Sequence, residues 1–298
     1  MANAIDYLDW RGDVPMSISP FNEVDGLIAA KLTSLDFTGI VPAEGGAALR
    51  DAVDAYFERY GDKDVRLGVL LPPGTVTMVK KMLASKRFAG VMLYDYVNHI
   101  DDVGAEQFCA LTVSMPDGSH FVAFRGTDDT IAAWREDFNM SAHDAVPAQV
   151  DAASYLKRAG WRFDGVLRVG GHSKGGNLSV YAAMSASAEL QERIADVFNY
   201  DGPGFRESVR GEPGYERIRP KIRSFLPQHS MVACSWSTIR RMRLSRAARR
   251  ALQRTTVSPG RCWVPNSFAA TNFPSAPACT ARPYAAGRRS WTCSSGRT

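Results

Sequence analysis

The chain has no apolar run approaching the roughly 18 residues that a membrane-spanning helix requires, so we expect no integral membrane segment. Its first eight residues lack the basic start and apolar centre of a secretory signal, which favours a cytoplasmic protein. Cysteine is scarce as well: Cys109 is the single cysteine of residues 1–232 and lies in a strand-like run, as expected of a buried thiol in a reducing compartment. No Cys/His cluster has the spacing of a metal site, and we expect neither a metal nor an organic cofactor.

The segment 233–298 contains no Asp, Glu, Lys or His. It holds 12 of the 36 Lys and Arg residues, so residues 1–232 carry 24 basic side chains against 31 acidic ones, a net charge of −7. The formal charge of +5 therefore originates in this segment. An arginine-rich stretch without acids or periodicity has three interpretations: a nucleic-acid-binding tail, a disordered linker, or translation in the wrong reading frame. The change in composition predicts a domain at 1–232 followed by an Arg-rich tail at 233–298.

A Gly-x-Ser-x-Gly motif occupies residues 171–175, between an apolar run at 165–170 and a run of good helix formers at 177–184. This order predicts a strand, a sharp turn and a helix, with Ser173 held above the sheet in a strained conformation that flanking glycines permit. Gly176 would let the helix pack closely on the strand. The motif indicates the nucleophile elbow of a serine hydrolase. The alternative is a glycine-rich loop with a chance serine; the glycine and lysine spacing of a phosphate loop is absent.

An earlier segment supplies the second part of such a site. The strand-like run 120–124 ends in Arg125, Gly126 and Thr127. We expect the backbone N–H groups of Thr127 and Lys174 to form an oxyanion hole, which stabilises a transition state by about 3 kcal/mol per donor. The alternative for residues 124–127 is a plain β-turn.

These motifs resemble those of the lipase class 3 branch of the α/β-hydrolases. Four further segments narrow the resemblance to a largely uncharacterised bacterial family of lipase-like hydrolases; they are Pro20–Asp25, Leu35–Val41, Trp134–Met140 and Tyr200–Gly204. The resemblance covers about residues 4 to 232. It implies an α/β-hydrolase fold and acyl-transfer chemistry on a small-molecule ester or acyl substrate, without identifying that substrate.

The same family resemblance gives the reading-frame interpretation a test. When residues 232–239 are reverse-translated with G/C-rich codons and shifted back by one nucleotide, they give Gly-Met-Leu-Leu-Glu-His-Asp. The same shift applied to residues 251–263 gives a stretch in which His-Asp is followed, after three further residues, by Trp. Both products resemble the family's own segment beyond the corresponding strand. We therefore hypothesise that residues from about 233 onward are out of frame, and that the C-terminal elements of the fold are missing or replaced.

The catalytic base is affected by this hypothesis. A hydrolase of this type needs a histidine downstream of its serine, and His229 is the one histidine after Ser173. His229 is either a substitute base or a histidine in a surface turn. Asp201 follows a strand-like run at 197–200, where the catalytic groups of open α/β sheets gather, so it is either the acid of the triad or a turn former. If the usual histidine is lost, the enzyme is expected to be inactive or impaired.

The remaining patterns predict one large α/β domain with a mostly parallel sheet that has one antiparallel portion and is flanked by helices. A hairpin is expected over 107–124 and a last strand over 221–226. For residues 94–102 we favour a polar loop over the edge of a substrate cleft. The expected helices are 47–60, 74–87, 129–139 and 148–159, besides the helix after the motif.

Three classes of function remain possible: an esterase-like serine hydrolase, a non-catalytic protein of the same fold that binds acyl or peptide ligands, and a nucleic-acid binder using its basic tail. We expect no nucleic-acid partner, because the tail has neither aromatic interleaving nor helical periodicity to organise its arginines.

Overall fold

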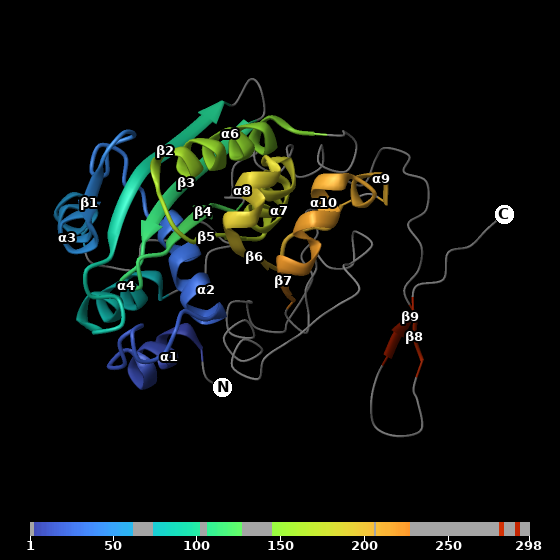
Figure 1. The fold of residues 1–298 in the computed structure, drawn as a ribbon. Helices are drawn as coiled ribbons and strands as arrows, with labels where there is room; N and C mark the ends of the chain where they lie inside the picture. The colour runs from blue at the N-terminus through green and yellow to red at the C-terminus, as the bar shows by residue number, and fades with distance from the viewer. Residues whose placement is uncertain are drawn as a thin grey trace, which may run out of the picture. The chain divides into compact units, whose positions relative to one another are not determined.

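A computed structural model describes residues 3–61, 74–101, 106–126, 145–205 and 207–226, and two short strands further along the chain. Within these residues helices cover both faces of a seven-stranded sheet, which makes the chain an α/β protein (Figure 1). The strands lie side by side in chain order. They are β1 (Gly46–Ala48), β2 (Met92–Asp101), β3 (Glu106–Ser114), β4 (His120–Phe124), β5 (Leu167–His172), β6 (Ile194–Tyr200) and β7 (Ile222–Phe225).

The sheet is mixed: the expected antiparallel portion is present, but it is larger than expected. β1 to β4 pair antiparallel, whereas β4 to β7 pair parallel. The expected hairpin is β3 and β4, and the expected last strand is β7. The difference comes from β1 and β2, which enlarge the antiparallel half of the sheet.

The polar loop expected at 94–102 was wrong, because residues 94–101 belong to β2; Asp102 lies outside the described residues. A bulge between Tyr94 and Val97 explains the misleading pattern. Asp95 in the bulge has a positive φ of 56°, and its carboxylate accepts a hydrogen bond from the Gly45 N–H at 3.0 Å and pairs with Arg162 at 3.0 Å. The strand therefore carries charged residues and breaks the alternation by which strands are usually identified.

Most of the predicted helices are present. Those over 47–60, 74–87 and 148–159 correspond to α3 (Leu49–Tyr60), α4 (Thr75–Ala84) and α6 (Pro147–Arg162), and the helix after the Gly-x-Ser-x-Gly motif is α7 (Lys174–Ser185). The helix expected at 129–139 lies outside the described residues. Helices that the sequence patterns did not predict are α1 (Ala4–Arg11), α2 (Glu23–Lys31), α8 (Ala188–Arg193), α9 (Glu207–Arg210) and α10 (Pro213–Ile218). Among the described residues, no helix has the length and apolarity needed to span a membrane.

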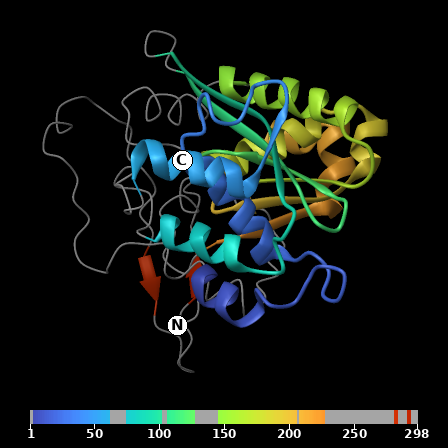
Figure 2. The same cartoon turned by 90° about the vertical axis from the view of Figure 1, so that its left-hand side faces the viewer.

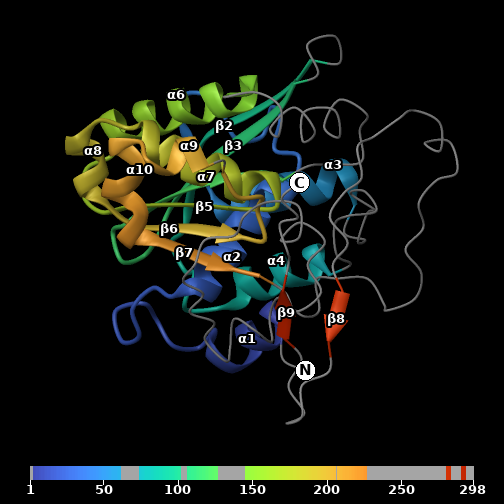
Figure 3. The same ribbon diagram turned by 90° about the vertical axis from the view of Figure 1, so that its right-hand side faces the viewer.

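Each face of the sheet has its own apolar core, and the two helical layers lie on opposite sides of the strands (Figures 2 and 3). Alternate residues of β4 show the division: Phe121 faces the core beneath α1 to α4, and Val122 faces the core beneath α6, α7 and α10. Cys109 is buried in β3 with a free thiol, as expected, and burial raises its pKa.

The chain divides into two compact units, residues 1–257 and 258–298. The sheet and its helices belong to the first unit. The described part of the second unit is an antiparallel pair of strands, β8 (Thr280–Arg282) and β9 (Ser290–Thr292).

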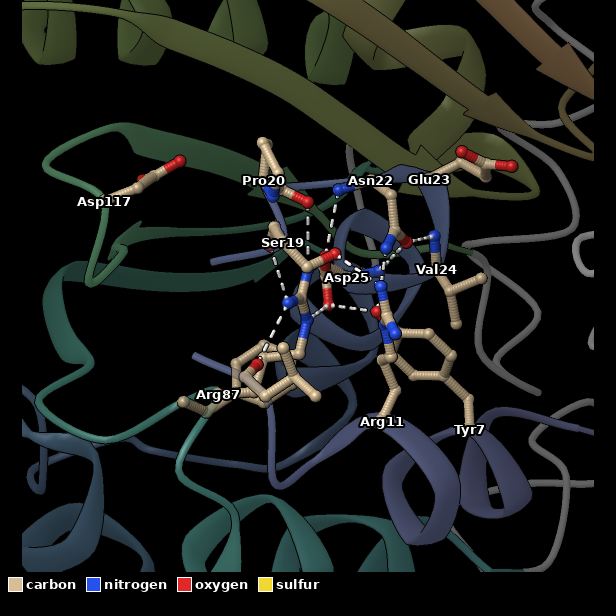
Figure 4. Close-up of polar contacts among 12 residues, drawn as sticks. Tyr7, Arg11, Ser19, Pro20, Asn22, Glu23, Val24, Asp25, Arg87 and Asp117 are labelled. Atoms are coloured by element: carbon tan, nitrogen blue, oxygen red, sulfur yellow. Dashed lines mark hydrogen bonds and ion pairs between the residues drawn. The ribbon is translucent and has the colours of Figure 1, made fainter. Parts of the chain in front are cut away.

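A buried ion pair between Asp25 and Arg87 anchors α2 to the rest of the first unit (Figure 4). Both side chains are fully buried; Arg87 donates from Nε to Asp25 Oδ1 at 2.7 Å and from Nη2 to Oδ2. The guanidinium also donates to the carbonyl oxygens of Val14, Ser19 and Pro20 at 3.2, 2.9 and 3.1 Å. One side chain therefore ties the loop before α2 to the turn after α4.

The first turn of α2 completes this cluster. Asn22 caps the helix by accepting from the N–H of Val24 at 2.8 Å, and Asp25 Oδ2 accepts from the Asn22 N–H at 2.9 Å. The Tyr7 hydroxyl donates to Asp25 Oδ1 at 3.1 Å. Burial and the Asp25 carboxylate raise the pKa of Tyr7 to about 12, so its hydroxyl remains a donor. The Asp25 carboxylate is therefore satisfied from three segments of the chain.

We predict that Arg87→Met lowers the free energy of unfolding by about 3–5 kcal/mol, because it leaves the Asp25 carboxylate buried without its cation. Urea denaturation of the variant and the parent chain measures the difference. Glu216→Gln is the matched control: it removes an ion pair with Arg219 whose side chains are 51% and 62% exposed, and we expect a change within about 0.5 kcal/mol. A loss below about 1 kcal/mol for Arg87→Met would contradict the anchoring role.

Candidate active site

Ser173 lies in a strained turn between β5 and α7. Its φ of 55° and ψ of −128° are values that residues other than glycine rarely adopt, at a cost of about 1–3 kcal/mol. Its N–H donates to the carbonyl oxygen of Tyr200 in β6, and its own carbonyl accepts from the Gly176 N–H, both at 2.8 Å. The strand, sharp turn and helix expected around the motif are therefore present.

The glycines of the motif are required by the close approach of β4, β5 and α7. A Cβ added at Gly175 would overlap the carbonyl oxygen of Phe124 in β4, and one added at Gly171 would overlap the Gly175 backbone. One added at Gly176 would overlap Oδ1 of Asn199. Because these contacts are to backbone or to a buried side chain, no larger residue fits without displacing a strand end, and the helix can follow the serine at once.

The end of β4 lies against Ser173. A Cβ built on Gly126 would stand 2.5 Å from the His172 carbonyl oxygen and 3.3 Å from the Ser173 Cβ. Arg125 extends the pairing with β3, since its N–H donates to the Cys109 carbonyl at 3.0 Å. Thr127, expected to supply an oxyanion donor, is the residue after Gly126 and lies outside the described residues. Lys174, the other expected donor, is the first residue of α7, at the helix end where backbone dipoles favour negative charge.

Asp201 lies beside the turn on the other side. It directly follows β6, which pairs with β5 so that Tyr200 is opposite His172. Asp201 is 9% exposed and has a positive φ of 58°, and its N–H donates to the Phe225 carbonyl at 2.8 Å. The next residue, Gly202, is so close to the turn that an added Cβ would stand 2.6 Å from the Ser173 carbonyl oxygen. The structure thus brings Ser173, Lys174 and Asp201 to one edge of the sheet.

Three of the five histidines lie in the described residues, and they are His99, His120 and His172. His120 begins β4, at the opposite end of the strand from Gly126, and accepts or donates a 2.8 Å hydrogen bond with Ser114 Oγ. His99 is within β2. His172 precedes the serine, and burial, together with the charge of Lys31, lowers its pKa to about 3. His229, the downstream candidate, lies outside the described residues.

Lys31 ends α2 beneath this edge of the sheet. Its side chain is buried, and its Nζ has no hydrogen-bond partner within the described part of the structure. Burial lowers its pKa from 10.5 to about 8. At neutral pH the folded protein therefore holds a buried ammonium group near His172 that no described residue satisfies, and this destabilises the native state.

The sequence assigned no role in the site to Tyr200 or Asn199, although Tyr200 begins one of the family-like segments. Tyr200 holds the Ser173 N–H through its carbonyl, and its hydroxyl donates to the Glu23 carbonyl of α2 at 2.5 Å. Asn199 Oδ1 accepts from the Gly202 N–H at 2.7 Å. Neither role is marked by a motif, because each depends on the pairing of β6 with β5. No group of three or more potential metal ligands occurs among the described residues.

Comparison with known proteins gives one match. A family model described as Mbeg1-like matches residues 82–259, which is more than half of the chain. The match confirms the resemblance to a family of lipase-like α/β-hydrolases. It continues past residue 232, where the composition changes. Neither the curated proteins nor the solved structures gave a match.

The unpaired Lys31 predicts a pH-dependent gain in stability for Lys31→Met. Because the folded-state pKa of about 8 is below the ordinary 10.5, protonation opposes folding below pH 8, and the penalty disappears as the pH rises from 8 to 10.5. The difference between these two pKa values corresponds to about 3 kcal/mol in the free energy of unfolding. Urea denaturation should therefore show Lys31→Met more stable than the parent at pH 7, with the difference shrinking towards pH 10. Equal stabilities at pH 7 would show that the ammonium has a partner.

Proposed function

This chain belongs to the Mbeg1-like family of lipase-like α/β-hydrolases, and from this membership and the geometry around Ser173 we propose that it is a serine hydrolase acting on small-molecule esters. The observation that carries the proposal is the strained backbone of Ser173 between β5 and α7. Strain of this kind persists where the surrounding structure imposes it, and it places a serine hydroxyl above the carboxyl edge of a sheet. We also propose that the mixed sheet and the helices on its two faces form an α/β-hydrolase fold.

In the proposed reaction, Ser173 Oγ attacks the ester carbonyl carbon and its proton passes to a base. The carbonyl oxygen becomes an oxyanion that accepts hydrogen bonds from the N–H groups of Lys174 and Thr127. Collapse of this intermediate breaks the bond to the alcohol, which leaves with the proton. Water then attacks the acyl-enzyme by the same route and releases the acid. Gly126, the residue before Thr127, packs against Ser173. This contact supports the proposed role of the Thr127 N–H, because it holds the chain directly before Thr127 beside the nucleophile.

We assign Asp201 as the acid that would orient the base. Its position at the carboxyl end of β6, next to the end of β5, supports this role. His229 is the candidate base because no other histidine follows Ser173 in the chain. If the segment from about residue 233 is out of frame, the histidine expected from the family pattern is lost, and we propose that this chain then hydrolyses its substrate slowly.

We also propose that the segment from about residue 233 is out of frame. The composition of the segment supports this proposal. The family match does not support it, because the match continues to residue 259. Sequencing the gene across codons 225 to 260 tests it. One lost or gained base near codon 232 is the expected result, and an intact frame would make the Arg-rich segment a natural part of the protein. The compartment proposed is the cytoplasm, in keeping with the buried free thiol of Cys109.

Ester hydrolysis tests the function. We predict that the chain releases p-nitrophenol from p-nitrophenyl butyrate faster than buffer does, at a rate far below the roughly 10 s⁻¹ typical of enzymes. Ser173→Ala should reduce the rate to that of buffer, because the residual catalysis requires the nucleophile. His229→Ala should lower it by more than about tenfold, because it removes the proposed base; a smaller loss would exclude His229 from that role.

Glu216→Gln, far along the chain on an exposed helix face, serves as the control and should keep the parent rate. A folded chain with no rate above buffer would contradict the hydrolase proposal. That result would favour the second candidate, a non-catalytic protein of the same fold that binds acyl ligands.

A further inference from the structure

Lys174 follows the serine of the motif, and its side chain lies inside the protein. It is 1% exposed, which is rare for lysine. Its Nζ donates to the carbonyl oxygen of Gln107 in β3 at 2.6 Å, and Gln107 is itself 2% exposed. Burying an ammonium group is costly unless it is well satisfied, so this placement needs a reason beyond packing.

The sheet order shows what this hydrogen bond crosses. Lys174 follows β5 and Gln107 belongs to β3, and β4 lies between these two strands. The pairing of β3 with β4 ends with Ala110 opposite Phe124, and the Arg125 N–H then donates to the Cys109 carbonyl. Gln107 lies two residues beyond Cys109, past the end of β4. The Lys174 side chain therefore spans the carboxyl end of β4.

The segment that it spans, residues 124–126, is confined from its other sides as well. On the α7 side, Gly175 contacts the Phe124 carbonyl so closely that no Cβ fits. Gly126 packs against the backbone of His172 and the Cβ of Ser173. On the β2 side, Arg125 Nη2 donates to Asn98 Oδ1 at 2.8 Å. The segment is thus held between β3, the serine turn and the first turn of α7.

We propose that the Lys174 side chain is a positioning residue, which fixes the end of β4 relative to the start of α7 and so holds the Lys174 N–H, a proposed oxyanion donor, in place beside the serine turn. The inference rests on the proposed hydrolase function, in which one donor follows residues 124–126 and the other is the Lys174 N–H. Donors of this kind act only when they are held close to the position of the oxyanion, and a displacement of about 1 Å can cost on the order of 100-fold in rate. The side chain and the backbone of one residue would then serve the same intermediate.

The test compares Lys174→Met with the parent chain on p-nitrophenyl butyrate and on butylboronic acid, which forms a tetrahedral adduct with an active serine. We expect kcat to fall by about 10- to 100-fold with KM within about twofold. The inhibition constant of the boronic acid should rise by a similar factor, because its adduct places an oxygen where the oxyanion lies. Lys221→Met is the control: it removes another lysine whose Nζ donates to a backbone carbonyl oxygen, that of Gln191 at 2.6 Å, and it should keep the parent values.

The outcomes separate this inference from the function on which it rests. A folded Lys174→Met chain with unchanged kcat and boronic acid affinity overturns the inference alone. Loss of thermal stability with unchanged boronic acid affinity overturns it too, since the bond would then serve the fold only. If Lys174→Met does not fold, Lys174→Gln takes its place, because its shorter side chain does not reach Gln107. The same two quantities, kcat and the inhibition constant of the boronic acid, then test the inference. A parent chain that neither hydrolyses the ester nor binds the boronic acid overturns the proposed function and this inference together.

Discussion

The crowding of β4, β5 and α7 around Ser173 is the constraint on which the site depends. Three backbones meet at distances that leave no room for a Cβ at Gly171 or Gly175. Helix α7 can therefore begin directly after the serine, and Ser173 takes a φ of 55°. The strain is held by hydrogen bonds on both sides of the residue, to Tyr200 and from Gly176. A serine placed in this way has its backbone fixed by the fold before any substrate arrives.

The helix beneath the sheet supports the same turn. The Asp25–Arg87 ion pair fixes the first turn of α2, and the Tyr200 hydroxyl donates to the Glu23 carbonyl there. Because the Tyr200 carbonyl also holds the Ser173 N–H, one residue links α2 to the strained turn. The buried ion pair at one end of the helix therefore contributes to the geometry at the active-site edge, although it lies outside the reacting groups.

The sequence predicted those parts of the fold whose causes are local. Flanking glycines predicted the turn at Ser173, and alternating or periodic apolar residues predicted β3, β4, α3 and α6. Helix α2 was missed because every residue from Val24 to Lys31 is buried, so it has no polar face and no amphipathic period. Partners distant in the chain gave no signal either: Arg87 is 62 residues from Asp25, and Lys174 is 67 residues from Gln107. The roles of Thr127 and His229 remain predictions.

The central claim is that the strained turn makes Ser173 a nucleophile. Treating the folded chain with a fluorophosphonate and locating the adduct by mass spectrometry of its peptides tests this most directly, because the probe bonds covalently to an activated serine whatever the natural ester is. We expect an adduct on Ser173 that a heat-denatured sample does not form. If a folded chain carries no adduct, or carries it on another serine, Ser173 is not the nucleophile.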